Sequence, residues 1–466
     1  MPEKYDVVIV GAGPAGIFAA LELSRVGGIS VLMLEKGRDL DKRVCPSIDK
    51  GIACPPCKLC DLTSGWGGAG AFSDGKLTLS SQVGGNLAEY VDAKALRDLI
   101  DYVDGVYARL AGTDEVFGVG EEVDEWQRKA ALAHLRLIPV RIRHIGTDRC
   151  FDVLDEMRKL LSSSVDVEMR AAACELMVKD GRIHAVKTRD GRTIQCGFLV
   201  VAPGREGADW LTAEAKRLNL ELVNNPVDVG LRVETPASVM EGLTRALYES
   251  KLEFYSKFFD DRVRTFCMCP YGEVATECTA GTDPVITVNG HSYSDRRTEN
   301  TNFALLVSTN FTKPFHEPIE YGRYLARLAN ILSGGVIVQR LGDLMAGRRS
   351  TPERLRRGIV EPTLKTATPG DLSFVLPYRY LTDITEMLEA LDKLAPGVCS
   401  RDTLLYGLEV KFYSSRLHLT ANLETGISNL FAAGDGAGVT RGLVQASVSG
   451  VIVAREIARR QGKEVG

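Results

Sequence analysis

Short apolar runs alternate with stretches of helical periodicity through the first half of the chain. Residues 5–10 form an apolar run, an Ala/Leu-rich stretch follows it, and a second apolar run ends at Glu35. This order predicts strand, helix and strand, because buried strands are short and apolar while helices repeat apolar positions every three to four residues. The same reasoning predicts further helices over 93–110 and 148–162, and strands over 165–168, 175–178, 184–188 and 193–202.

The pattern changes at Pro226. Alternating apolar and polar residues predict strands over 227–234, 254–258, 264–268 and 303–308, and helical spacing predicts helices over 319–332 and 384–394. Two long polar stretches, 289–302 and 346–377, are predicted to be loops, which at such length usually carry function. A short strand over 430–433 and a final helix over 442–460 return to the pattern of the first part. The sequence therefore predicts a sheet domain inserted into an α/β domain.

A glycine-rich turn joins the first predicted strand to the first helix. Glycines at 11, 13 and 16 allow a tight turn, close approach of a pyrophosphate, and packing of helix on strand. The phosphate charge is then met by the helix N-terminus, and an acid at the end of the second strand accepts hydrogen bonds from ribose hydroxyls. The motif predicts a bound dinucleotide contacted by Gly11, Ala12, Gly13, Pro14, Ala15, Gly16, Glu35 and Lys36.

A second glycine motif near the end of the chain favours FAD over NAD. A short apolar strand, Gly434-Asp435-Gly436 and a long helix follow one another there. This order supplies a carboxylate for a ribityl hydroxyl and amides for a phosphate or the flavin O2 edge. The residues predicted to contact the cofactor here are Gly434, Asp435, Arg441 and Gly442.

A third glycine-rich run, residues 65–76, is predicted to approach the same ligand, because glycine lets backbone come close. The contacts predicted from it are Gly68, Ala69, Gly70, Ser73 and Lys76. Cys174, before a short strand, and Ala202 and Gly204, after the long strand, complete the predicted cofactor contacts.

Four cysteines lie in the proline-containing loop 38–63. Cys45, Cys54, Cys57 and Cys60 contain two Cys-x2-Cys steps that share Cys57. The spacing is similar to ferredoxin-type iron-sulfur sites, and four thiolates also suit Zn²⁺. Redox-active thiols that exchange electrons with the flavin, and unligated loop thiols, are the alternatives.

Length and charge bound the remaining possibilities. A chain of 466 residues predicts two or three domains, and a net charge of −4 argues against nucleic acid as a partner. No apolar run reaches the length of a membrane span, and the first strand begins too early for a signal peptide. A cytoplasmic location is therefore expected.

These motifs carry a family resemblance. The two glycine motifs, Glu35 and Ala202-Pro203-Gly204 resemble the two-dinucleotide-motif flavoprotein superfamily, which includes glutathione reductase-like and p-hydroxybenzoate hydroxylase-like enzymes. More closely, the four-cysteine insertion and residues 66–76, 289–294, 347–351 and 434–442 resemble an uncharacterised family of FAD-dependent dehydrogenases. Pro203 departs from the threonine usual in the superfamily.

The resemblance implies an α/β fold with a Rossmann-like FAD-binding domain and an inserted mixed-sheet α+β substrate domain. The expected domains are 1–225, the first part of the FAD-binding domain; 226–400, the inserted substrate domain; and 401–466, the C-terminal part of the FAD-binding domain. The resemblance implies no particular substrate.

Candidate catalytic residues come from the two polar stretches. His291 and Tyr293 are candidate proton donors, and Arg348 and Arg349 offer a fork for a carboxylate or phosphate. We expect an FAD-dependent oxidoreductase that transfers a hydride between flavin N5 and a small anionic metabolite. The alternatives are a single-component flavin monooxygenase reduced by transiently bound NAD(P)H, and an electron relay in which the cysteine loop serves an electron-transfer partner.

Overall fold

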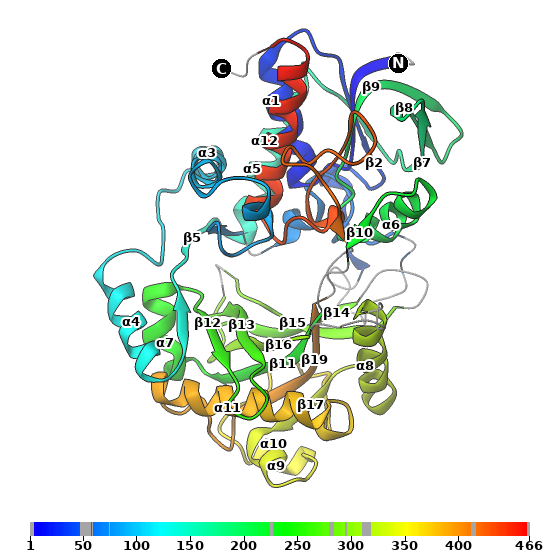
Figure 1. Ribbon diagram of the computed structural model, residues 1–466. Coiled ribbons are helices and arrows are strands. Elements are labelled where there is room, and N and C mark those ends of the chain that lie inside the picture. The colour runs from blue at the N-terminus through cyan, green and yellow to red at the C-terminus, as the bar shows by residue number, and fades with distance from the viewer. Residues whose placement is uncertain are drawn as a thin grey trace. The chain divides into compact units, whose positions relative to one another are not determined.

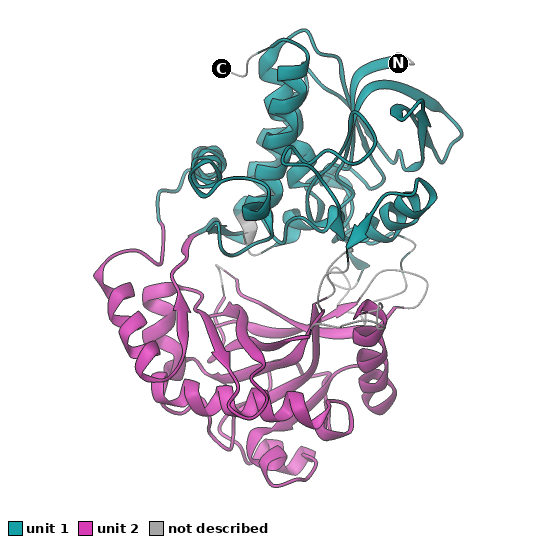
Figure 2. Ribbon diagram, in the orientation of Figure 1, with its two compact units in different colours: residues 1–115, 143–225, 413–466 teal, residues 116–142, 226–412 magenta. Residues whose placement is uncertain are grey.

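The computed structural model describes residues 4–46, 57, 59–73, 75–223, 227–278, 284–293, 296–309, 318–411 and 416–463, without the side chains of residues 147 and 148. These fall into two compact units (Figure 2). Unit 1 comprises Met1–Glu115, Arg143–Asn225 and Tyr413–Gly466, and unit 2 comprises Val116–Ile142 and Pro226–Phe412.

Unit 1 is built on a seven-stranded sheet whose central strands are parallel. Its order is β6-β2-β1-β9-β8-β7, and β21 also pairs with β9. The strands are β6 (Asp166–Met169), β2 (Val31–Glu35), β1 (Lys4–Val10), β9 (Thr193–Val201), β8 (Arg182–Thr188), β7 (Ala173–Lys179) and β21 (Leu430–Ala432). Strands β6, β2, β1, β9 and β21 are parallel, whereas β8 and β7 are antiparallel additions. The carboxyl ends of the parallel strands therefore lie at one edge of the sheet, where α/β folds bind ligands.

Two helices from opposite ends of the chain pack together in unit 1. They are α1 (Pro14–Val26) and α12 (Leu443–Arg460), drawn side by side in blue and red in Figure 1. A Cβ on Gly450 would lie 2.0 Å from the carbonyl oxygen of Ala15, so the two backbones meet directly. The other elements of unit 1 are η1 (Leu40–Lys42), η2 (Gly68–Phe72), β3 (Lys76–Leu79), η3 (Leu87–Glu89), α3 (Ala93–Ala111), α5 (Thr147–Leu161), η4 (Arg205–Gly207), α6 (Ala208–Arg217), β10 (Leu222–Val223), β20 (Arg416–Leu417) and η6 (Asp435–Ala437).

Unit 2 contains an eight-stranded, largely antiparallel sheet of order β18-β17-β19-β11-β16-β13-β12-β4. The strands are β18 (Thr368–Pro369), β17 (Ile337–Arg340), β19 (Leu404–Lys411), β11 (Val227–Pro236), β16 (Asn300–Thr309), β13 (Arg262–Cys269), β12 (Lys251–Tyr255) and β4 (Arg136–Ile138). A separate hairpin is formed by β14 (Glu273–Cys278) and β15 (Ile286–His291). The helices are α4 (Glu121–Leu132), α7 (Ala237–Leu247), α8 (Pro318–Ser333), α9 (Leu341–Met345), α10 (Pro352–Arg356), η5 (Leu372–Phe374) and α11 (Tyr378–Leu394). Strand β5 (Arg141–His144) lies where the chain returns to unit 1.

The two faces of the unit 2 sheet differ in character, because side chains alternate along each strand. Val229, Leu231 and Val233 of β11 belong to an apolar core with residues of α7, α8 and α11. The intervening side chains point to the opposite face, which we call the polar face. It comprises Asp228, Arg232, Glu234, Lys251, Arg264, Phe266, Asn302, Tyr406, Glu409 and Lys411, placed by the strand registers.

The segment Val116–Ile142 departs from the expected organisation. The predicted domains include it in residues 1–225, but it packs in unit 2, because β4 pairs antiparallel with β12. The predicted domain borders at 225/226 and 400/401 otherwise remain predictions.

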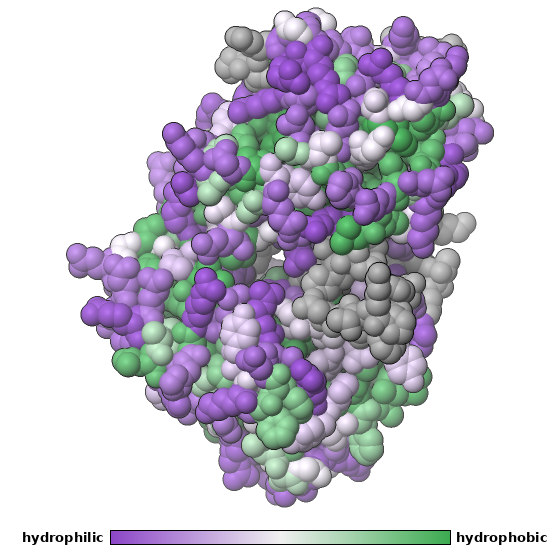
Figure 3. Space-filling view, viewed as in Figure 1, coloured by the Kyte–Doolittle hydropathy of each residue, from purple (hydrophilic) through white to green (hydrophobic). Residues whose placement is uncertain are grey.

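The described helices do not include one with the length and apolarity needed to cross a membrane. On the face drawn in Figure 3, hydrophilic residues are spread over both units, with hydrophobic residues interspersed. Such a mixture is normal for a protein surface.

Asp383, on α11, supports a prediction about pH. Its side chain is fully buried, and its pKa is raised to about 6 by burial and by the nearby Asp261 carboxylate. Since the folded-state pKa exceeds the ordinary 3.8, the unfolded chain releases this proton first, and stability is lost as the pH rises from about 4 to about 6. We expect Asp383→Asn to raise the free energy of unfolding near neutral pH by about 1–3 kcal/mol.

Urea unfolding at several pH values tests this expectation. The stabilisation of Asp383→Asn should shrink as the pH is lowered to about 4. A difference between variant and parent that does not change with pH would contradict the assignment.

Candidate functional site

The glycine turn of unit 1 sits against the strand end that follows β9. Gly11 has a φ of +105°, and a Cβ there would lie 2.1 Å from the carbonyl oxygen of Ala202. A Cβ on Gly16 would lie 2.0 Å from the carbonyl oxygen of Gly11. Both positions therefore require glycine. The predicted motif has the tight turn and the close packing of helix on strand that dinucleotide binding needs.

Gly13 differs from Gly11 and Gly16 because no described residue occupies the space into which a side chain would project. A Cβ on Gly13 would meet no atom of the described residues within 4 Å, and Gly13 caps α1 without any side-chain hydrogen bond. Pro14 occupies the first turn, which contains no acid. Amides at the start of α1 thus have no capping side chain and no competing negative charge, which fits a phosphate group.

Glu35 ends β2, as predicted, and is buried. Its carboxylate accepts hydrogen bonds from the backbone N–H groups of Ala12 (2.9 Å), Gly37 (2.7 Å) and Gly65 (3.0 Å). A carboxylate offers about four acceptor positions, so one remains for a ribose hydroxyl. Glu35 therefore also holds the glycine turn and the third glycine-rich run together.

The third glycine-rich run lies beside the start of α1. A Cβ on Gly68 would lie 3.2 Å from Cα of Gly13, and one on Gly70 would lie 2.8 Å from Leu443 at the start of α12. Ala69 shares the same short helix, η2. The Ser73 hydroxyl donates to the carbonyl of Gly70, and Lys76 begins β3.

Arg43 holds this run in place and was not predicted from the sequence. Its buried guanidinium donates to the carbonyls of Asp61 (2.8 Å), Trp66 (2.6 Å) and Gly68 (2.8 Å). Desolvation lowers the pKa of Arg43 to about 10, which leaves it charged at neutral pH. A single arginine in an irregular segment carries no sequence signal for such a role.

The late glycine motif meets the same edge of the sheet. A Cβ on Gly436 would lie 2.4 Å from the carbonyl oxygen of Gly204, and Gly434 lies beside Ala15 of α1. The Asp435 carboxylate accepts from the Thr440 hydroxyl (2.7 Å) and the Gly442 N–H (3.3 Å), while burial raises the pKa of Asp435. Gly442 caps α12 without a side-chain bond.

Three predicted cofactor residues have protein partners. The Lys36 ammonium lies 3.3 Å from Glu206, the Cys174 thiol donates to the carbonyl of Lys187, and the Arg441 N–H donates to the carbonyl of Gly84. Cofactor contacts by these residues remain predictions. The glycine cradle, the uncapped helix starts and Glu35 together fit the pyrophosphate and ribose of FAD.

The sequence of Gly118-Val119-Gly120 has no further glycine at the spacing of a dinucleotide motif and predicts no helix after it, and the second of these predictions is wrong. Helix α4 begins directly after it, at Glu121. Its first turn carries Glu121, Glu122 and Asp124, whose negative charges oppose a phosphate at that helix start. The segment therefore offers no second phosphate site of the kind at Gly13.

The cysteine loop is described only in part. Cys45, Cys57 and Cys60 are free thiols, and Cys54 lies outside the described residues. Within the described ranges, no group of three His, Cys, Asp or Glu side chains could hold a metal ion. An iron-sulfur cluster, Zn²⁺ and redox thiols thus stay predictions for this loop.

His291 and Tyr293 lie at the end of the β14–β15 hairpin, with ring centroids 6.5 Å apart. The Tyr293 hydroxyl donates to Glu273 (2.9 Å), and the Arg296 guanidinium lies 3.9 Å from the Tyr293 ring centroid. Burial and the Glu273 carboxylate raise the pKa of Tyr293, so its hydroxyl stays protonated and suits a hydrogen-bond donor better than a proton donor.

The hairpin requires glycine at position 290, next to His291, because other side chains lie too close for a Cβ there. A Cβ on Gly290 would lie 2.0 Å from Nη2 of Arg232 and 2.2 Å from Oδ1 of Asn302. Fully buried Arg232 donates to both carboxylate oxygens of Glu409 (3.2 and 3.0 Å) and to Asn302 (2.7 Å). The hairpin backbone thus packs on a buried ion pair of the polar face.

Arg348 and Arg349 follow α9. The Arg348 Nε lies 2.9 Å from Asp343, and the Arg349 carbonyl accepts from Arg354 (2.8 Å). The structure thus brings Arg348, but not the Arg349 side chain, into a cavity of about 330 Å³ lined by charged residues.

Comparison with known proteins adds two family matches. Residues 226–412 match the family described as FAD-dependent protein, C-terminal domain-like, and residues 4–43 match the family described as FAD binding domain. An uncharacterized protein of Clostridium beijerinckii is 29% identical over 482 residues, covering 98% of this chain and 81% of the relative.

Similar solved structures include formate oxidase of Aspergillus oryzae, with 11% identity, a TM-score of 0.45, and coverage of 98% of this chain and 99% of that one. L-proline dehydrogenase of P. horikoshii has 13% identity, a TM-score of 0.42, and coverage of 99% and 95%. The two family matches lie on the glycine motif of unit 1 and on the main segment of unit 2. The chain is therefore similar to FAD-binding and FAD-dependent proteins in both units.

Proposed function

We propose that the chain transfers a hydride between flavin N5 and a small anionic metabolite, with FAD held by unit 1 and the metabolite bound through unit 2. The observation that carries the choice of an anion is a group of cations on the polar face. Around the Phe266 ring lie Lys251 Nζ, the Arg264 guanidinium carbon and Lys411 Nζ, at 5.4, 4.9 and 5.6 Å from the ring centroid.

These cations are held in place by carboxylates. Lys251 pairs with Glu249, Arg264 pairs with Asp228 (2.5 Å), and Lys411 pairs with Glu409 (3.1 Å) and Glu277 (3.3 Å). The Phe266 ring supplies a flat apolar contact, and a substrate carboxylate would share the three cations with the carboxylates that already pair with them.

When bound, FAD supplies the acceptor or donor of the hydride. The residues of unit 1 orient it, since the start of α1 fits its pyrophosphate and Glu35 retains an acceptor position for its ribose. In unit 2, the cations of the polar face would orient an anionic group. Tyr293, kept protonated by its raised pKa, would donate a hydrogen bond to the substrate, and His291 remains the candidate proton donor.

The proposal is tested by mixing the FAD-loaded protein, without oxygen, with a panel of hydroxy, amino and unsaturated acids. We expect at least one acid to bleach the flavin absorbance, and Lys411→Met to slow that bleaching about tenfold, because a charged hydrogen bond to the substrate is lost. Lys411→Arg should restore part of the rate. Lys365→Met is the control, because Lys365 is exposed and, within the described ranges, its ion pair is with nearby Glu361.

FAD content and thermal unfolding of each variant separate loss of binding from loss of fold. If Lys365→Met slows bleaching as much as Lys411→Met, the polar face does not bind the substrate. If bleaching instead requires NAD(P)H, and the product then gains an oxygen atom on admission of air, the alternative of a monooxygenase replaces the proposal. Iron with sulfide in the purified protein would favour the electron relay.

A further inference from the structure

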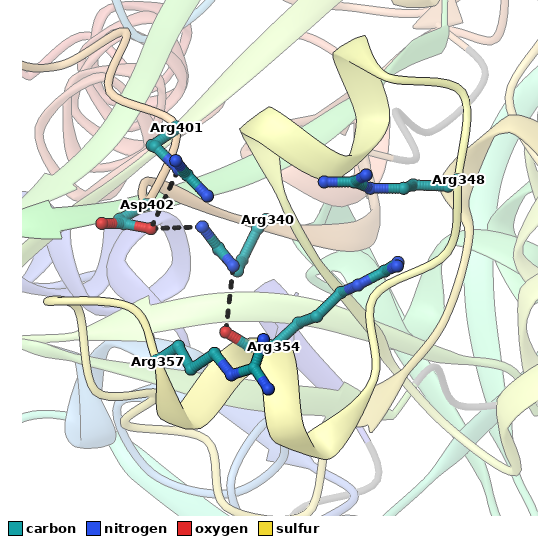
Figure 4. A pocket seen from close by; sticks show the side chains of 6 residues that line it. All are labelled: Arg340, Arg348, Arg354, Arg357, Arg401 and Asp402. Carbon is teal, nitrogen blue, oxygen red and sulfur yellow. Dashed lines mark hydrogen bonds and ion pairs between the residues drawn. The ribbon is translucent and has the colours of Figure 1, made fainter.

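A pocket within unit 2 is lined almost entirely by arginine. Its volume is about 330 Å³, and it is lined by Arg340, Arg348, Arg354, Arg357, Arg401 and Asp402. Figure 4 shows these side chains arriving from β17, from the turn after α9, from α10 and from the turn before β19.

The backbone around the pocket is tied together. The Arg340 N–H donates to the Ser350 hydroxyl (2.9 Å), and that hydroxyl donates to Asp343 (2.8 Å). The Gly342 N–H donates to the carbonyl of Arg401 (3.0 Å), and Gln339 donates to the carbonyl of Arg348 (2.9 Å). The arginines are therefore carried by a connected frame and are not independent surface residues.

Arg340 is the buried centre of this group. It is 5% exposed, and it donates to Asp402 (2.5 Å) and to the carbonyl of Arg354 (3.0 Å). Its Nε is buried and has no hydrogen-bond partner within the described part of the chain. An unmet donor on a buried cation is costly, so a ligand that accepts from it would be bound favourably.

Charge in the pocket is unbalanced. Two carboxylates, Asp402 and Asp343, pair with Arg340, Arg348, Arg354 and Arg401. Arg357 makes no ion pair with a described residue. Five guanidinium groups against two carboxylates leave an excess of three positive charges, which attracts a polyanion.

The side chains that line the pocket limit the chemical class of ligand that it can bind. Guanidinium groups match phosphate oxygens with paired hydrogen bonds. Among the described residues, the lining contains no aromatic or aliphatic side chain that could stack on a base or hold an apolar body. The charged group of the ligand is therefore the part that the pocket recognises.

We propose that this arginine pocket binds the phosphoryl groups of a small polyanion of the pyrophosphate type. The site lies wholly within unit 2 and uses none of the residues that form the FAD cradle. It goes beyond the proposed hydride transfer and does not depend on it.

Titration calorimetry of the FAD-loaded full-length protein with inorganic pyrophosphate tests the proposal. We expect saturable binding, weakened about tenfold or more by Arg357→Gln combined with Arg401→Gln, because these exposed arginines lose charged hydrogen bonds without a buried role. Arg356→Gln is the matched control: Arg356 is next to Arg357, 75% exposed, and outside the pocket. It should change the affinity less than twofold.

Citrate separates phosphoryl recognition from general attraction to anions, and we expect it to bind at least about tenfold more weakly than pyrophosphate. Absence of pyrophosphate binding, an equal loss in Arg356→Gln, or equal binding of citrate would each overturn the proposal. Thermal unfolding of every variant without ligand shows that the fold is retained.

Discussion

Replacing Gly13 with alanine is expected to remove most FAD binding while leaving the fold of the apoprotein intact. The φ of Gly13 is −83°, which alanine adopts readily, and the added methyl would meet no atom of the residues that the structure describes within 4 Å. That space is where a pyrophosphate approaches the start of α1, so the methyl would displace the phosphate. We expect FAD affinity to fall by about 1–3 kcal/mol, and apoprotein stability to change by no more than about 1 kcal/mol.

Gly11→Ala provides the contrast within the same turn. Its methyl would lie 2.1 Å from the carbonyl oxygen of Ala202, at a φ of +105° that alanine disfavours. We expect this variant to lose about 3 kcal/mol or more of folding free energy, and its cofactor with it. FAD content after purification and thermal unfolding of the apoproteins distinguish the two outcomes. Normal FAD affinity in Gly13→Ala would show that the phosphate binds elsewhere.

This contrast also shows why the fold of unit 1 could be predicted from its sequence. The strand, turn, helix and acid of residues 5–35 are contiguous, and each position is dictated by local geometry. The strands and helices predicted over 93–110, 148–162, 184–188 and 193–202 are confirmed for the same reason, since their periodicity is long and regular. The contacts of Arg43 could not be predicted from the sequence, because its carbonyl partners lie 18 to 25 residues away along an irregular segment.

The fold of unit 2 was harder to predict, because its strands and its pocket are formed by residues that lie far apart in the sequence. Strand β4 has only three residues and becomes a strand by pairing with β12, so it is too short for sequence periodicity to predict it. The stretch 346–377, expected to be a loop, contains the short elements α10, β18 and η5. Arg348 was predicted as an anion ligand, but its pocket is assembled from arginines up to 61 residues apart in sequence, between Arg340 and Arg401.

The largest loss of stability in unit 2 is expected from Arg232→Met. Arg232 and Glu409 are both fully buried, and the guanidinium also donates to Asn302 and to the carbonyl of Cys267 (2.6 Å). Methionine fills similar space but leaves Lys411, at 3.1 Å, as the one described cation that still pairs with Glu409. Removing one partner of a buried ion pair typically costs about 3–5 kcal/mol, because the remaining charge stays desolvated.

Urea unfolding, with the midpoint and slope both fitted, measures this cost. Arg262→Met is the control from the same sheet: Arg262 pairs with Glu253 at 3.4 Å but is 43% exposed, so its loss should cost less than about 1 kcal/mol. In the double variant Arg232→Met with Glu409→Leu, the destabilisation should be smaller than the sum of the single changes, because the unpaired charge is gone. Additive effects would contradict a direct pairing.

Gly290→Ala tests the same centre from the hairpin side. Its methyl would press on Nη2 of Arg232, so it should destabilise the parent by about 1–3 kcal/mol and the Arg232→Met variant by less. That dependence would show that Gly290 serves packing over the buried ion pair. Replacements of His291 and Tyr293, in the same hairpin, should then be measured by their effect on the rate of the reaction.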